Sequence, residues 1–227
     1  MKKIIISLIT LLAFFTNVSI LCSHAENTEK KSKKKEKRRW AVTIKNGYFY
    51  PKDEVLRNIF CQCGKSGGYW IEGAVRYNMY KGLNLEASGS YFEKNGKALN
   101  GTACTKVKIP TIGLGLKYFL NCFDKVSFFA GAGVRIFFYN EKNESDEVKR
   151  CYKKTTVGGM VNFGCEVDVY KGFFVDLFFD YNFKKLTPCN CDNCRSYNPN
   201  TGTCCPSSFA DLHIGGLVTG IGLGYKF

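Results

Sequence analysis

Cysteine is the most reactive residue type that this sequence gathers in clusters. The 227-residue chain has 12 cysteines, and five of them fall within residues 189–205. Thiols can pair as disulfides or bind zinc, and Cys191 and Cys194 have the spacing of half a zinc site. Cys204 and Cys205 are adjacent, and two adjacent thiols cannot easily both bind one tetrahedral ion. We therefore favour disulfides over the rival zinc site, and we expect no metal and no other cofactor.

A second set of reactive groups lies near the end of the chain. Ser208, Asp211 and His213 contain a nucleophile, an acid and a base, which is the set that nucleophilic catalysis uses. The period of two in a strand would place Asp211 and His213 on one face. Spacing alone is a weak indication, and a polar cluster at the end of a strand is the simpler interpretation. We predict no catalytic residue and no enzymatic activity.

Charged residues form a third set, because they alternate with apolar residues along the chain. Six are basic and six are acidic, so the set is electrically balanced. Such a balance is what a filled, water-poor interior requires, because unpaired buried charges are costly. The expected interior charge network consists of Lys45, Glu72, Arg76, Glu86, Lys117, Arg135, Glu166, Asp168, Asp176, Asp180, Lys184 and Lys226.

The elements that carry these charges are eight segments in which apolar and polar side chains alternate. They span residues 40–50, 69–79, 83–91, 111–118, 126–138, 161–169, 173–184 and 216–227. A tilted membrane-spanning strand needs roughly 9–11 residues, whereas soluble strands have about 5–6. The apolar faces carry tyrosine and tryptophan near their ends, as at a lipid interface. The pattern predicts an all-β fold: an eight-stranded antiparallel up-and-down transmembrane β-barrel, plugged by side chains. Pro110 should interrupt the fourth strand.

Composition agrees with this fold class. The formal charge is +14, and aromatic residues make up 15% of the chain. A disordered chain would be poor in aromatics, and the slightly negative mean hydropathy of −0.17 excludes a polytopic helical membrane protein.

The sequence before the barrel divides into two segments. Residues 1–25 have the basic head, apolar run and small residues of a secretory signal peptide, with an uncleaved membrane anchor as the alternative. Residues 26–39 form a basic arm with eight lysines or arginines in its last ten residues. Export argues against nucleic-acid binding, so we expect a solvated arm beside an anionic lipid surface. Residues 40–227 form the barrel.

The connections between segments alternate in length. Short turns lie at residues 80–82, 120–125 and 170–172, and long gaps at 51–67, 94–105, 140–154 and 186–208. Outer-membrane barrels have short periplasmic turns and long outside loops, which puts both chain ends in the periplasm. Nine cysteines fall in the predicted outside loops, and we expect disulfides among them or to other chains. These are Cys61, Cys63, Cys104, Cys151, Cys189, Cys191, Cys194, Cys204 and Cys205.

The closing segment Gly220–Phe227 and the middle hairpin, Ile112–Tyr118 followed by Val126–Gly133, carry a family resemblance. The chain resembles the small outer-membrane β-barrels, which include the OmpA transmembrane domain, OmpX, OmpW and opacity-type proteins. The resemblance implies that Leu223, Tyr225 and Phe227 are an assembly signal for the barrel-assembly machinery. It also implies the outer membrane of a Gram-negative-type bacterium. No catalytic motif of the family carries over, and the many cysteines depart from its usual composition.

The combined prediction is an outer-membrane barrel with a charge-plugged interior and cysteine-rich surface loops. Its expected role is structural or surface-interacting, in the manner of an adhesin. A conduit for small solutes or hydrophobic molecules, of the OmpW type, is the first alternative, and a lipid-modifying barrel enzyme is the second. Expected partners are outer-membrane lipid, the barrel-assembly machinery, and disulfide-linked envelope proteins or a host surface, but no nucleic acid.

Overall fold

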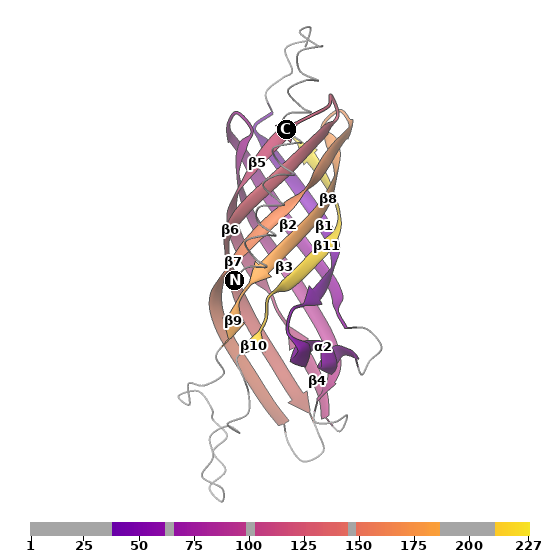
Figure 1. The fold of residues 1–227 in the computed structure, drawn as a ribbon, viewed down its shortest axis with the longest axis vertical. Coiled ribbons are helices and arrows are strands. Elements are labelled where there is room, and N and C mark those ends of the chain that lie inside the picture. Colours follow the sequence, from indigo (N-terminus) through magenta and orange to yellow (C-terminus); the bar gives the residue numbers. More distant parts are fainter. Residues whose placement is uncertain (1–37, 62–65, 99–102, 145–148, 187–211) are drawn as a thin grey trace, which may run out of the picture.

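Antiparallel strands close into a barrel in the computed structural model (Figure 1), which describes residues 38–61, 66–98, 103–144, 149–186 and 212–227. Eight strands form the ring, in the order β1–β2–β3–β5–β6–β7–β8–β11, and β11 pairs with β1 to close it. The predicted barrel is confirmed. The wall strands are β1 (Trp40–Pro51), β2 (Gly68–Tyr80), β3 (Leu83–Ala98), β5 (Thr111–Asn121), β6 (Val126–Glu144), β7 (Lys149–Tyr170), β8 (Phe173–Phe183) and β11 (Gly216–Lys226).

Ring closure is continuous along the seam between the first and last strands. Residues Ala41–Pro51 of β1 pair with Gly216–Lys226 of β11 without a shift in register. Inside a bilayer, backbone amides and carbonyls have no water to bond, so a sheet can span it only when every edge is paired. The seam therefore makes the fold compatible with a membrane.

Tight turns lie at the end of the barrel where β1 begins and β11 ends, at the top of Figure 1. Lys81 and Gly82 have φ values of 39° and 89°, and Lys171 and Gly172 have values of 40° and 101°. Two successive positive φ angles are typical of a type I′ turn, whose twist matches that of paired strands. Residues 122–125 join β5 to β6 at the same end. We call this the turn end and the opposite one the loop end.

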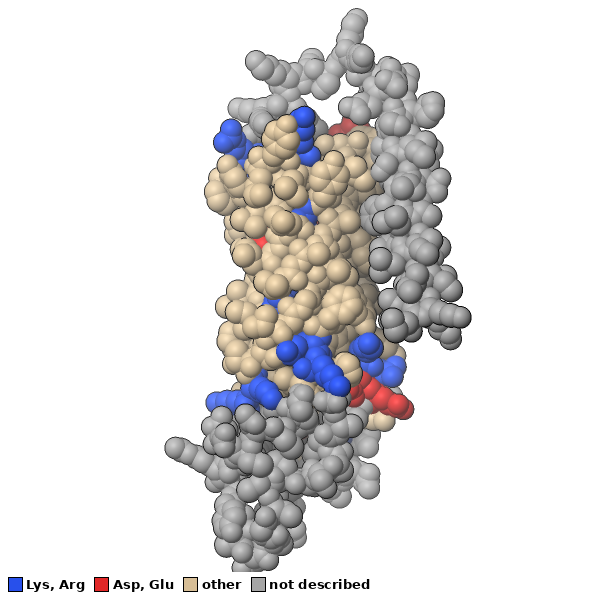
Figure 2. Space-filling view, turned by 60° about the vertical axis from the view of Figure 1, so that its left-hand side comes forward, with Lys and Arg blue, Asp and Glu red and all other residues tan. Residues whose placement is uncertain are grey.

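Side chains alternate between the two faces of the wall as the sequence predicted. Ile44 is 68% exposed on the outside, whereas its neighbour Lys45 is 1% exposed on the inside. The outward residues of all eight wall strands form an apolar belt. Figure 2 shows one face of the belt as a tan band. Members of the belt include Val42, Ile44, Ile71, Val75, Leu85, Leu114, Leu116, Val134, Val161, Leu177, Ile221 and Leu223.

Two of the predicted loops are largely strands instead. The gaps at 94–105 and 140–154 were expected as loops, but β3, β6 and β7 extend into them, and β4 (Ala103–Lys108) pairs with both β3 and β6. β6 and β7 pair from Val126 and Val167 out to Glu144 and Lys149. The prediction was wrong because the strands continue beyond the lipid-facing region. Outside that region the outward residues are no longer apolar, so the alternating pattern that indicates a strand is lost. Inward residues such as Val107 and Tyr139 remain buried beyond the belt and hold the extension together.

The other long gaps also contain secondary structure. Helix α2 (Glu54–Cys61) lies at the loop end in the first gap, and β9 (Lys185–Leu186) pairs with β10 (Leu212–His213) around the last one. As predicted, Pro110 falls at a break, between β4 and β5. The Ile109 amide still donates to the Phe92 carbonyl at 2.8 Å across this break. Among the described residues, α2 included, no helix has the length and apolarity needed to cross a bilayer.

Candidate functional site

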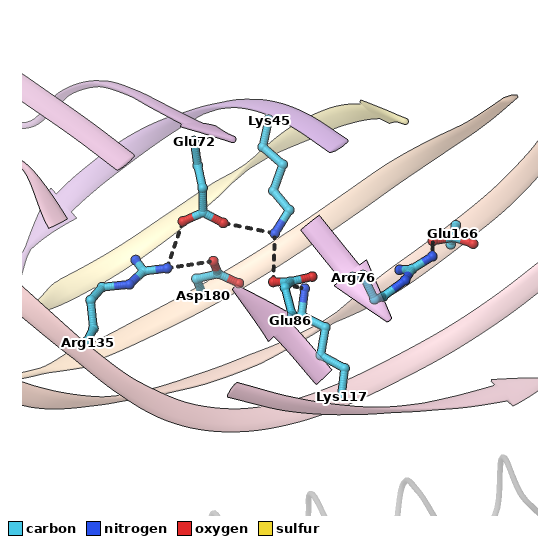
Figure 3. A network of polar contacts seen from close by, with 8 residues as sticks. All are labelled: Lys45, Glu72, Arg76, Glu86, Lys117, Arg135, Glu166 and Asp180. Carbon is cyan, nitrogen blue, oxygen red and sulfur yellow. Dashed lines mark hydrogen bonds and ion pairs between the residues drawn. The ribbon is translucent and has the colours of Figure 1, made fainter. Parts of the chain in front are cut away.

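A buried carboxylate lies at the centre of the barrel interior, between two cations. Glu72 of β2 accepts hydrogen bonds from Lys45 of β1 at 3.0 Å and from Arg135 of β6 at 2.7 Å (Figure 3). All three side chains are 1% exposed. The Arg135 guanidinium also lies 4.0 Å from Asp180 of β8. Two cations on one carboxylate, with a further carboxylate beside them, bring charges from four strands together.

A second carboxylate extends this cluster toward the turn end. Glu86 of β3 lies 2.8 Å from the Lys117 ammonium and 3.7 Å from the Lys45 ammonium. Lys45 therefore connects the two acidic groups, Glu72 and Glu86. Buried ion pairs are stable only when each charge is well compensated. Sharing Lys45 between two carboxylates therefore lowers the cost of burying these charged side chains in the barrel interior.

A separate group of ion pairs lies nearer the turn end. The Arg76 guanidinium donates to Glu166 of β7 at 2.8 Å. The Lys226 ammonium lies 2.5 Å from both Glu166 and Asp168. These contacts tie the last strand to β7 across the interior, although β8 separates the two strands in the wall.

Aromatic rings cover the charges toward the turn end. The Arg76 guanidinium lies 4.3 Å from the centroid of Phe119, and the Lys117 ammonium 4.7 Å from that of Phe129. The two rings are 5.3 Å apart. Cations over aromatic faces are attracted by the ring quadrupole, so these phenylalanines both fill space and hold the cations.

A second aromatic layer fills the loop end of the interior. Phe49 lies 4.9 Å from Phe92, which in turn lies 5.9 Å from Phe60 of helix α2. Trp70 is 2% exposed, and the Arg135 guanidinium lies 5.4 Å from its ring. Our sequence reasoning missed these inward aromatics. The parity of the strands could have found them, since Phe49 and Phe92 each lie an even number of residues from a polar inward position.

The structure does not place all twelve predicted network residues together. Asp176 is buried on the inside wall, but no cation among the described residues lies within 4 Å of its carboxylate, and its Oδ1 has no hydrogen-bond partner. Lys184 lies outside the network, half-buried beside a pocket in the barrel wall. It follows directly after the end of β8 at Phe183, so it is not part of a wall strand. The other ten residues make the ion pairs described above.

Most of the predicted disulfide cysteines cannot be compared with the structure. Cys63, Cys189, Cys191, Cys194, Cys204 and Cys205 lie outside the described residues, and only the backbone positions of Cys61 and Cys151 are described. Cys104 is an exposed free thiol. It pairs in register with Glu144 of β6, whereas Cys151 lies on the far side of β6, opposite Lys142. Two strand spacings are about 10 Å, too far for a disulfide between Cys104 and Cys151.

The possible catalytic set is described only in part. His213 lies in β10, opposite Lys185, and its backbone amide donates to Asp53 at 2.8 Å. Ser208 and Asp211 lie outside the described residues. Within the described part of the chain, no cluster of three or more histidine, cysteine or carboxylate side chains could hold a metal ion.

Comparison with known proteins identifies the architecture. No family model and no curated protein sequence matches the chain. Among solved structures, Neisserial surface protein A (NspA) superposes with a TM-score of 0.56 at 13% identity, over 83% of this chain and 97% of its own. The fold is that of the small outer-membrane eight-stranded barrels.

Two further barrels of this kind support the same fold. OprG, an outer membrane protein of Pseudomonas aeruginosa, gives a TM-score of 0.54 at 14% identity, over 84% of this chain and 97% of its own. The attachment invasion locus protein Ail of Yersinia pestis, solved with the heparin analogue sucrose octasulfate, gives 0.51 at 12% identity, over 85% and 100%. The predicted resemblance to the small outer-membrane barrels is confirmed for the fold, and the predicted outer-membrane location agrees with these neighbours.

Proposed function

We propose that this chain is an outer-membrane barrel with a charge-plugged interior that acts through its surface, as a structural or adhesion-like protein. The observation that carries the proposal is the shared carboxylate Glu72, held between Lys45 and Arg135 with no exposed side chain among them. Aromatic layers cover this cluster on both sides, and α2 packs Phe60 over the loop end. If the interior is filled, other molecules can bind this protein only at its outer surface.

The fold neighbours are consistent with a surface role. NspA is named as a surface protein, and Ail as an attachment and invasion protein that binds a heparin analogue. The extension of β3, β4, β6 and β7 beyond the apolar belt gives this chain a projecting structure at the loop end (Figure 1). A projecting sheet supplies the solvent-exposed area that contact with another molecule requires.

Planar-bilayer conductance tests the plugged interior directly. The refolded full-length protein is expected to give no stable single-channel steps, because ion pairs and aromatic rings fill the interior of the part of the chain that the structure describes. The variant Glu72→Gln should raise the frequency of transient openings, since it loosens the central cluster. Regular conductance steps from the unaltered protein would contradict the proposal.

A conduit for hydrophobic molecules is a second candidate, favoured by one pocket in the wall. The pocket, of about 400 Å³, lies where β7 continues beyond the end of β8, and it is lined in part by Val157, Tyr181, Phe183 and Asn182. Asn182 is 1% exposed, and neither its amide oxygen nor its nitrogen has a hydrogen-bond partner among the described residues. The lining combines these apolar side chains with Lys52, Lys184 and Lys185. Such a mixed lining suits a small amphiphilic molecule with a polar or acidic head.

Uptake of a hydrophobic dye by cells producing the protein tests this conduit. Val157→Trp should fill the pocket and reduce uptake, whereas the matched belt variant Val134→Trp should leave it unchanged. Equal uptake by both variants would remove the second candidate.

The remaining expectations about processing and assembly are part of the same proposal. Leu223 is 67% exposed on the outer face of β11, and Phe227, which follows β11, is 56% exposed, so an assembly factor could reach both. We propose that residues 1–25 direct export and that the loop cysteines form disulfides within the chain or to other envelope proteins. Non-reducing gels test the disulfides: mobility unchanged by reductant would exclude them.

A further inference from the structure

A group of lysines lies on the outer face of the projecting sheet. We call it the basic wall; it consists of Lys97 of β3, Lys106 and Lys108 of β4, Lys142 of β6 and Lys153 of β7. Figure 2 shows lysine and arginine side chains gathered directly below the tan belt. From this arrangement we infer that the basic wall binds the phosphate groups of lipids in the leaflet on the loop side.

The strand register brings like charges together in the basic wall. Lys106 pairs directly with Lys142, and Lys108 lies one outward position along β4 from Lys106. Like charges directly opposite one another destabilise a sheet. Glu93 compensates Lys106 in part, and an external anion would compensate the Lys142 charge that remains.

The described carboxylates near the basic wall carry less negative charge than its lysines carry positive charge. Glu93 lies 2.5 Å from the Lys106 ammonium and 3.2 Å from that of Lys108, so one carboxylate serves two cations. Lys142 and Lys153 are exposed, and no described carboxylate lies within ion-pair distance of either. At least two positive charges of the wall are therefore available to an anion from outside.

The position of the wall favours lipid over a soluble polyanion. Lys142 lies on the same face as Phe138 of the belt, four residues farther along β6, and Lys153 stands in the same relation to Val157 on β7. Four residues of a strand span about 13 Å, and less along the bilayer normal because the strand is tilted. The polar headgroup region is about 5–7 Å thick on each side. A lysine side chain can bend back over this distance, so its ammonium reaches the phosphate layer.

Lipid retention measured by native mass spectrometry tests the basic wall. The full-length protein is extracted from nanodiscs containing either diphosphorylated lipid A or its dephosphorylated form. Each basic residue near an anionic surface contributes roughly fivefold to binding, so removing three should weaken retention of the phosphorylated lipid roughly 100-fold. The test variant is Lys106→Gln/Lys142→Gln/Lys153→Gln.

A matched variant with the same change in charge controls for net charge. Lys81→Gln/Lys125→Gln/Lys171→Gln removes three lysines that lie on three separate turns at the turn end, and it should leave retention within about twofold of wild type. Heat-modifiable gel mobility confirms that both variants fold. Equal retention by the wall variant and wild type would overturn the inference, as would loss of binding to soluble heparin with no change in lipid retention. Lipid binding at this wall does not depend on whether the interior conducts.

Discussion

Replacing Glu72 by glutamine removes the central negative charge of the barrel interior while preserving side-chain size. Among the described carboxylates, Lys45 then has Glu86 alone within 4 Å, at 3.7 Å, and Glu86 is already paired with Lys117 at 2.8 Å. Arg135 keeps only Asp180, 4.0 Å away. Removing one partner of a buried ion pair costs about 3–5 kcal/mol, because a desolvated charge is left without compensation. We therefore expect the free energy of unfolding to fall by about 3–5 kcal/mol.

Urea-induced unfolding in phospholipid vesicles, followed by the change in gel mobility on heating, measures this loss. Glu93→Gln is the matched control, since Glu93 also accepts two lysines but is about one-third exposed, and its loss should be several-fold smaller. The double variant Glu72→Gln/Lys45→Met should recover part of the cost, with a coupling energy of about 1–3 kcal/mol. Equal losses for Glu72→Gln and Glu93→Gln would refute the idea that the interior charges stabilise the barrel.

Three further outcomes follow from the structure. Ile44→Arg puts a charge on the outer face beside the central cluster and should cost about 2–4 kcal/mol in vesicles, with Ile44→Leu as a near-neutral control. Phe60→Ala removes the contact of α2 with Phe92 and should make residues 54–61 sensitive to protease while the barrel stays folded. Hydrogen bonds from Lys106 and Tyr91 lower the pKa of Glu93, which lies beyond the belt, to about 2 from its ordinary value of 4.5. Its contribution to stability is therefore present above pH 4.5 and lost as the pH falls toward 2, so wild type and Glu93→Gln should converge over that range in acid titrations of unfolding.

The barrel could be predicted from sequence because membrane strands show their faces in every second residue. Ile44 and Lys45, or Leu116 and Lys117, differ so strongly in polarity that their opposite placement follows from period two alone. The short turns were also predictable from their length, and Gly82 and Gly172 adopt one of the two positive φ angles of a type I′ turn without strain.

The parts that could not be predicted depend on contacts between distant strands. The contact between Phe92 and Phe60 depends on where α2 packs against β3, which the period of two does not indicate. The extension of β6 and β7 beyond the membrane has mixed polar composition and looked like a loop. Lys45 and Arg135 both bind Glu72 because of the way in which β1, β2 and β6 are placed around the barrel. No local sequence pattern indicates this placement.

The two tryptophans of the chain provide the most direct test of which side chains face lipid and which face the interior. Trp40 is 47% exposed on the outer surface near the turn end, and Trp70 is 2% exposed inside the barrel. Trp70→Phe leaves Trp40 as the only indole, and Trp40→Phe leaves Trp70. In vesicles containing brominated acyl chains, fluorescence from Trp40 should be strongly quenched and fluorescence from Trp70 should not. Quenching of Trp70 with protection of Trp40, or no quenching of either, would contradict the account.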